Sequence, residues 1–171
     1  MSAAGVDPVD VGAVRRVVSG VGPDGRSTVV EDAASPYLVQ SIPGYVQHTE
    51  IWTTPSPPPG EGPLADGALG APTESYDPVD PRGTICRVVC FQPDPPGTDP
   101  DDLMHSTTTV DYIVVLAGEI TCIYEDGSDV TLGPGEILVQ RGVPHSWSNR
   151  GEVPCTYVSV QVGAPDHAPA G

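Results

Sequence analysis

Proline and glycine interrupt this chain so often that no long helix is predicted. The 171 residues include 21 prolines and 20 glycines, and both residue types disfavour helix interiors. No stretch keeps an apolar residue every three to four positions for long enough to indicate a long helix. Short apolar runs separated by turn residues recur instead, a pattern typical of a sandwich or barrel of strands. The sequence therefore predicts a single all-β domain, within the usual size range of one domain.

The apolar runs predict short strands and divide the chain into three parts. Strands are expected at 14–18, 27–30, 37–42, 46–54, 84–92, 119–124, 129–132, 137–140, 144–149 and 155–162, with a further strand running on from His105. Residues 1–27 are expected to form an N-terminal arm or hairpin, 28–163 one domain, and 164–171 a flexible tail. Residues 55–83, rich in proline and glycine, are expected to form a long loop, either a disordered or loosely packed insertion or a lid over a cavity.

Charge and the N-terminal sequence narrow the classes of partner. Seven basic and 23 acidic residues give a formal net charge of -16, which repels nucleic-acid phosphates and anionic lipid. No apolar run approaches the roughly 20 residues of a spanning helix, and the first residues lack the basic start and apolar core of a signal peptide. A cytoplasmic protein without nucleic-acid or membrane partners is expected. The four cysteines include no Cys-x-x-Cys pair, so free thiols are expected.

Chemistry-bearing residues concentrate between His105 and Asn149. Alternate residues of an extended strand share a face. One such set combines a histidine and an acid with hydroxyls and an apolar continuation: His105, Thr107, Thr109, Asp111, Ile113 and Val115. A second set, later in the chain, comprises His145, Trp147 and Asn149. Two histidines and one carboxylate would therefore come from different strands of one barrel.

The spacings in this stretch resemble the two motifs of the cupin family. Six residues separate Asp111 from Gly118, two separate Gly142 from His145, and three separate His145 from Asn149. The resemblance is to small one-domain cupins found in bacteria and in fungal polyketide gene clusters. It implies a double-stranded β-helix, the cupin jelly-roll barrel, with extra N-terminal strands.

The same resemblance implies a divalent metal held by His105, Asp111 and His145. Two imidazoles and a carboxylate suit Fe(II), and similar sets hold Mn, Ni, Co or Zn. The sequence departs from the family at Thr107, which stands where the second histidine of the first motif would be, and at Asp111, which replaces glutamate. The resemblance also implies a homodimer, with the N-terminal strands as the expected contact, and a small oxygenated organic substrate, polyketide- or aromatic-acid-like.

Further pocket candidates come from the residues themselves. His48, Glu50 and Trp52 share one face of the strand at 46–54, which either faces solvent or a second subunit, or lines the cavity with an acid-base residue or a further ligand. Arg87 is the one charge in an apolar run and either lies on an outer face or reaches into the pocket to hold an anionic substrate. The remaining candidates are Thr107 and Thr109 as hydroxyls for substrate oxygens, and Trp147 as a cavity wall.

Three functions of different class fit these residues. The first is a metal-dependent lyase, decarboxylase, dehydratase or isomerase, in which the metal polarises an oxygen and Glu50, His48 or Asp111 moves the proton. The second is a mononuclear Fe(II) dioxygenase. The third is a cupin that binds a small molecule without catalysis, which the loss of a histidine at Thr107 would explain.

Overall fold

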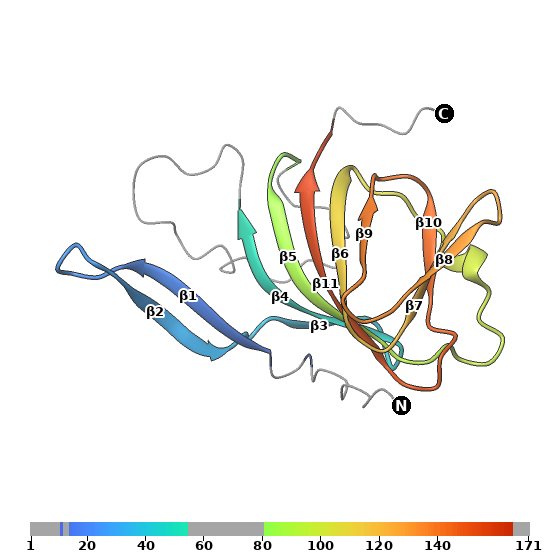
Figure 1. Ribbon diagram of the computed structural model, residues 1–171, viewed down its shortest axis with the longest axis horizontal. Helices are drawn as coiled ribbons and strands as arrows, with labels where there is room; N and C mark the ends of the chain where they lie inside the picture. Colours follow the sequence, from blue (N-terminus) through green and yellow to red (C-terminus); the bar gives the residue numbers. More distant parts are fainter. Residues whose placement is uncertain (1–10, 12–13, 55–80, 166–171) are drawn as a thin grey trace.

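The computed structural model describes residues 11, 14–54 and 81–165, and its strands form two facing sheets and a separate hairpin (Figure 1). The larger sheet has the order β3-β4-β5-β11-β6-β9 and the smaller has the order β10-β7-β8. The larger sheet consists of β3 (Leu38–Ile42), β4 (Val46–Thr54), β5 (Thr84–Phe91), β6 (Thr109–Ala117), β9 (Ile137–Gln140) and β11 (Cys155–Gly163). The smaller consists of β7 (Ile120–Tyr124), β8 (Asp129–Leu132) and β10 (His145–Ser148). The predicted all-β jelly roll is confirmed.

The core lies between the two sheets because each strand turns alternate residues inward. Along β6 the burial alternates without a break, with Ile113 and Val115 buried and Tyr112 exposed. The inward residues of both sheets form one apolar cluster that includes Phe91, Trp147 and Tyr157. The aromatic rings of Phe91 and Tyr157 stack with centroids 6.1 Å apart. The jelly roll is thus closed on one side by aromatic packing.

The N-terminal hairpin is a two-stranded sheet of its own. Its strands, β1 (Arg15–Val21) and β2 (Ser27–Ala34), pair with each other and with no other strand of the described residues. The hairpin extends to Ala34, beyond the expected end of the arm at residue 27. Figure 1 shows it projecting from the β3–β4 side of the larger sheet.

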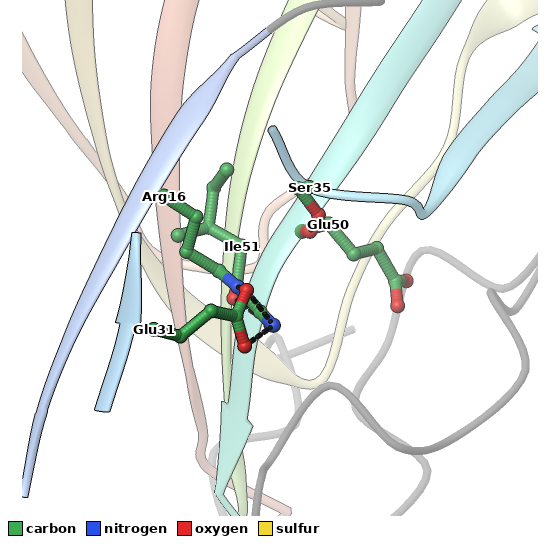
Figure 2. Close-up of polar contacts among 5 residues, drawn as sticks. All are labelled: Arg16, Glu31, Ser35, Glu50 and Ile51. Atoms are coloured by element: carbon green, nitrogen blue, oxygen red, sulfur yellow. Dashed lines mark hydrogen bonds and ion pairs between the residues drawn. The ribbon is translucent and has the colours of Figure 1, made fainter. Parts of the chain in front are cut away.

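Two hydrogen bonds tie the base of the hairpin to β4, as Figure 2 shows. The Ser35 hydroxyl donates to the carbonyl oxygen of Glu50 over 2.6 Å. The Arg16 guanidinium donates to the carbonyl oxygen of Ile51 over 3.3 Å and is paired with the Glu31 carboxylate. The side chain of Glu50 points away from this contact, toward the interior (Figure 2).

A β-bulge in β4 overturns one expectation. Glu50 lies opposite Arg87 on β5, but the next register pair is Trp52 with Cys86, so Ile51 is an extra residue. One inserted residue exchanges the two faces of the strand beyond it. Trp52 therefore leaves the face that His48 and Glu50 share, and the Arg16 guanidinium lies 6.0 Å from its ring centroid. The expectation that Trp52 lines the pocket is corrected accordingly.

The other strand predictions hold, with one difference at the first motif. β6 begins at Thr109, while His105 forms an isolated β-bridge with His145. A 3₁₀ turn, Pro100–Leu103 (η2), lies between β5 and His105. The possible lid lies almost wholly outside the described residues, as does most of the tail. Within the described ranges, no helix is long and apolar enough to cross a membrane.

We expect Gly118→Ala to destabilise the fold more than Gly127→Ala. Both glycines have positive φ, +70° and +80°, so alanine costs about 1 kcal/mol of backbone strain at either position. At Gly118 the new Cβ would also meet the Pro154 carbonyl oxygen and lie 2.8 Å from the Cα of Cys155, whereas at Gly127 nothing lies within 4 Å. Urea unfolding should show a loss of about 3 kcal/mol for the first variant and about 1 kcal/mol for the second. Equal losses would contradict this packing.

Candidate functional site

A cavity of about 70 Å³ lies inside the jelly roll. It is large enough for several water molecules or the reactive part of a small molecule. Seven of the residues selected from the sequence line it: His48, Arg87, His105, Thr107, Asp111, His145 and Trp147. The structure therefore brings most of the predicted site together.

The two motif histidines face each other at this cavity. The backbones of His105 and His145 exchange two hydrogen bonds of 2.9 Å, and their rings lie with centroids 4.5 Å apart. The Nδ1 atom of each ring lies 2.9 Å from a carbonyl oxygen two residues earlier, of Leu103 and Val143 respectively. Because a carbonyl can only accept, both Nδ1 atoms carry the proton, and Nε2 is the unprotonated nitrogen in each neutral ring.

Burial keeps two of the pocket imidazoles neutral. The pKa of His145 is lowered to about 4, chiefly by burial, with the neighbouring His105 adding to the effect. The pKa of His48 is also lowered to about 4, by burial and then by the charge of Arg87. Metal ligation requires a neutral imidazole, so His145 is in the form that a metal needs at neutral pH.

A buried ion pair lies beside the cavity, which Arg87 lines and Glu50, contrary to expectation, does not. Glu50 and Arg87 lie opposite each other on β4 and β5, and a guanidinium nitrogen is 2.9 Å from the carboxylate. Both side chains are 5% exposed. Arg87 also donates to the amide oxygen of Gln161 over 3.2 Å, and the Gln161 amide nitrogen donates to Asp111 over 3.2 Å. A polar band therefore crosses β4, β5, β11 and β6 in the order of the sheet.

The band ends in two threonines. The Thr109 hydroxyl contacts the Asp111 carboxylate and lies 2.9 Å from the Thr107 hydroxyl. A hydroxyl has one proton and a carboxylate only accepts, so Thr109 donates to Asp111 and accepts from Thr107. Thr107 lines the cavity, whereas Thr109 is buried behind it, 1% exposed. The threonine at the usual histidine position thus supports the acid of the first motif.

The predicted three-ligand metal set is assembled only in part. Among the described residues, no three His, Cys, Asp or Glu side chains lie close enough to hold a metal ion together. His105 and His145 fit a metal, because a proton on Nδ1 leaves Nε2 as the nitrogen that can coordinate when the ring is neutral. Asp111 lines the same cavity, but its two carboxylate oxygens are bonded to Thr109 and Gln161. The structure supports the imidazole pair and leaves the carboxylate as the third member of a proposal.

Several lining residues were not identified from the sequence. The cavity is also lined by Ser41, Ser159 and Gln161. Ser159 and Gln161 lie on β11 at the inward parity that includes Tyr157. Two polar side chains at inward positions of a largely apolar strand could have identified Ser159 and Gln161 as pocket residues. No local pattern could have identified Ser41, because its place at the cavity depends on the pairing of β3 with β4.

Part of the chain is similar in sequence to known proteins. A family model described as a cupin domain matches residues 90–161. This segment is a cupin domain. The expected likeness to cupins of fungal biosynthetic clusters is also confirmed. The chain is 40% identical over 70 residues to phomopsin biosynthesis cluster protein C' of Diaporthe leptostromiformis, a match covering 41% of this chain and 34% of that protein.

The chain is also similar to a second fungal protein over part of its length and to a solved structure over most of its length. The chain is 31% identical over 68 residues to the cupin-domain-containing oxidoreductase virC of Hypocrea virens, covering 40% of this chain and 32% of that protein. A crystal structure of a putative ethanolamine utilization protein Q from Salmonella typhimurium covers 89% of this chain and 98% of its own, at 10% identity and a TM-score of 0.47. The matched segment spans about a third of the length of these fungal relatives.

We expect Arg87→Met to destabilise the protein strongly. The change leaves the Glu50 carboxylate buried without its ion-pair partner, which costs about 3–5 kcal/mol in comparable sites. The double variant Glu50→Gln, Arg87→Met should recover much of this loss, because no unpaired charge remains. Chemical denaturation of the two single variants and the double variant measures the coupling. Strictly additive losses would show that the ion pair does not organise the interior.

Proposed function

We propose that the cupin domain is a metal-dependent enzyme acting on a small oxygenated organic molecule, by acid-base chemistry of the lyase, decarboxylase, dehydratase or isomerase type. The observation that carries the proposal is the matched pair of imidazoles. His105 and His145 both have Nδ1 committed to a backbone carbonyl, an arrangement that orients metal-ligating histidines and fixes Nε2 as the donor.

His105 and His145 would hold the divalent ion, with Asp111 supplying negative charge to the set. The cavity is lined by one carboxyl group, of Asp111, and by one guanidinium, of Arg87, whose charge is balanced by Glu50 outside the lining. Such a balance favours a bound cation. The metal, which the donor set allows to be Fe(II), Mn, Ni, Co or Zn, would act as a Lewis acid on a substrate oxygen.

His48 is the residue we assign to proton transfer. Its Nε2 is buried without a hydrogen-bond partner among the described residues, and the ring lines the cavity. Its Nδ1 lies 2.9 Å from the hydroxyl of Ser41, a half-buried residue on β3. A proton arriving at Nε2 can be matched by one leaving through Ser41. Glu50, which the sequence also suggested for proton transfer, is held by Arg87 and does not line the cavity, so we assign it no direct contact with the substrate.

The charged residues at the cavity favour some substrate charges over others. Arg87 is already paired with Glu50 and bonded to Gln161, so its charge is balanced before a ligand enters. This arrangement does not favour the anionic substrate expected from the sequence. An oxygenated group without net negative charge fits better, and an organic acid would depend on the metal for its countercharge.

A second, outer cavity of about 200 Å³ continues from the first. The two share Phe91, His105 and Trp147, and Ile42, Leu103 and Met104 complete most of the outer wall. We assign the polar inner cavity to the reacting oxygenated group and the outer one to the apolar body of the substrate. The end of η2 and the residue after it, Leu103 and Met104, thus help to line the outer cavity next to His105.

Two other functions remain as alternatives. A mononuclear Fe(II) dioxygenase is favoured by the printed description of the virC relative as an oxidoreductase and by the pair of imidazoles. A cupin that binds a small molecule without catalysis is favoured by Thr107, which replaces a histidine of the motif with a hydroxyl bonded to Thr109.

Metal analysis of purified variants tests the assignment. Protein prepared without chelator should contain close to one divalent ion per chain, and His145→Ala should lose it while keeping the wild-type circular dichroism spectrum. The matched control His48→Gln removes another imidazole of the same cavity. It should retain the metal and lose substrate turnover. A wild-type protein that contains no metal would favour the non-catalytic binding function over the enzyme. Full metal content in His145→Ala would show that His145 is not a ligand.

Oxygen dependence separates the two enzymatic functions. With a substrate found by screening uncharged oxygenated compounds, the acid-base enzyme should give the same initial rate with and without oxygen. The dioxygenase would require iron and consume oxygen in proportion to product. An oxygen electrode and an anaerobic assay measure both quantities, and stoichiometric oxygen uptake would reject the acid-base mechanism.

A further inference from the structure

The outer cavity has a single carboxylate in its lining, that of Asp102, and among the described residues no lysine or arginine lines it. Apart from His105, the other lining residues are apolar or aromatic: Ile42, Phe91, Leu103, Met104 and Trp147. Within residues 11, 14–54 and 81–165, the Asp102 carboxylate has no hydrogen-bond or ion-pair partner. A negative charge therefore stands at an otherwise apolar cavity without a countercharge from this part of the chain.

The other acids of the same segment have different positions and roles. Residues 93–104 contain four aspartates and no basic residue. Asp94 accepts a hydrogen bond of 2.6 Å from the Tyr45 hydroxyl, and Asp99 caps η2 by accepting one of 3.0 Å from the Asp101 backbone amide. Asp101 is exposed and lines neither cavity. Asp102 is thus the one member of the group that a ligand in the outer cavity would meet.

The inner cavity does not supply the missing positive charge. Apart from its histidines, the charged residues in its lining are Arg87 and Asp111. The Arg87 guanidinium lies 2.9 Å from the Glu50 carboxylate, so its charge is already balanced. The two cavities and the ion pair beside them hold three carboxylates against one guanidinium. A divalent ion at the histidines would offset the carboxylates of the inner cavity and leave Asp102 in the outer one.

A directional chain of hydrogen bonds gives the inner cavity an acceptor as well. Arg87 donates to the Gln161 oxygen, so the Gln161 nitrogen donates to Asp111. Thr109 donates to the same carboxylate and accepts from Thr107. Because a hydroxyl has one proton, Thr107, which is 4% exposed and lines the cavity, offers a ligand only its oxygen lone pairs. Both cavities therefore favour a ligand that brings hydrogen-bond donors.

We propose that Asp102 selects the substrate by charge: the substrate carries a protonated amine at the end of its apolar body, bound in the outer cavity by the Asp102 carboxylate and the aromatic rings of Phe91 and Trp147. Aromatic rings attract cations, and apolar neighbours reduce the screening by water. The reacting oxygenated group stays uncharged and enters the inner cavity, where a hydroxyl can donate to Thr107. This inference rests on the proposed function for the statement that the bound molecule is a substrate.

Three probes of equal length test the selection. Aminohexanol, hexanediol and hydroxyhexanoate each carry a hydroxyl at one end of a six-carbon chain and, at pH 7, an ammonium, a hydroxyl or a carboxylate at the other. The chain has two tryptophans, and Trp147 lines both cavities whereas Trp52 lies off the pocket face. In a Trp52→Phe background the fluorescence of Trp147 therefore reports binding. At constant ionic strength aminohexanol should bind about three- to fivefold more tightly than hexanediol, and hydroxyhexanoate should bind most weakly.

A pair of neighbouring aspartates supplies the variant and its matched control. In the same background, Asp102→Asn should weaken the binding of aminohexanol to that of hexanediol and leave hexanediol unchanged. Asp101→Asn removes the same charge one residue away and should keep the full preference for aminohexanol. Both residues are exposed, so neither change disturbs the core.

The outcomes separate this inference from the proposed function. No binding of aminohexanol, no preference for it in the Trp52→Phe protein, a preference that survives Asp102→Asn, or an equal loss in both variants would each overturn the inference. Binding is measured without turnover. A protein that contains no metal and still shows the preference that depends on Asp102 would contradict the proposed function and support the selection by charge. A metal-containing, active enzyme without the preference would contradict this inference alone.

Discussion

A guanidinium buried between two sheets has to be matched by an acid, and this requirement organises the interior of the protein. Arg87 occurs inside an otherwise apolar strand, and its charge is balanced by Glu50 directly across the strand pair. Gln161 extends the contact, because its amide can satisfy Arg87 with oxygen and Asp111 with nitrogen in one orientation only. Side chains from four strands are thereby joined in one buried polar network, which favours a single register of those strands.

The other wall of the cavity carries histidines and aromatic rings instead of an ion pair. Backbone hydrogen bonds position the two histidines, and aromatic rings pack next to them in the core. Trp147 lies edge-on to His145, with ring centroids 5.7 Å apart, and packs on Tyr157. The cavity therefore has a charged, hydrogen-bonded side at Arg87 and an aromatic side at the two histidines. A ligand with one oxygenated group and one apolar body matches this division, and a metal between the imidazoles would add the missing positive charge.

The sequence was sufficient for the fold because strand parity and turn chemistry are local properties. The runs at 129–132 and 137–140 coincide with β8 and β9. His105, Asp111 and His145 line one cavity, but among the described residues they do not form the expected three-ligand group. Three features depended on tertiary pairing and could not be read locally. The Ile51 bulge moved Trp52 off the pocket face, the partner of Arg87 was set by the β4–β5 register, and Asp111 was taken up by Thr109 and Gln161 rather than joining the histidines.

The extra residue in β4 has a consequence for how the two ends of that strand depend on each other. The Ile51 carbonyl oxygen accepts a hydrogen bond from the Arg16 guanidinium of the hairpin, and the carboxylate of the preceding residue, Glu50, pairs with Arg87. A strand one residue shorter would exchange its inward and outward side chains from that point on. The length of β4 is thus under a double restriction: deleting Ile51 would turn the Trp52 indole toward the interior and would also remove one of the two hydrogen bonds that join the hairpin to β4.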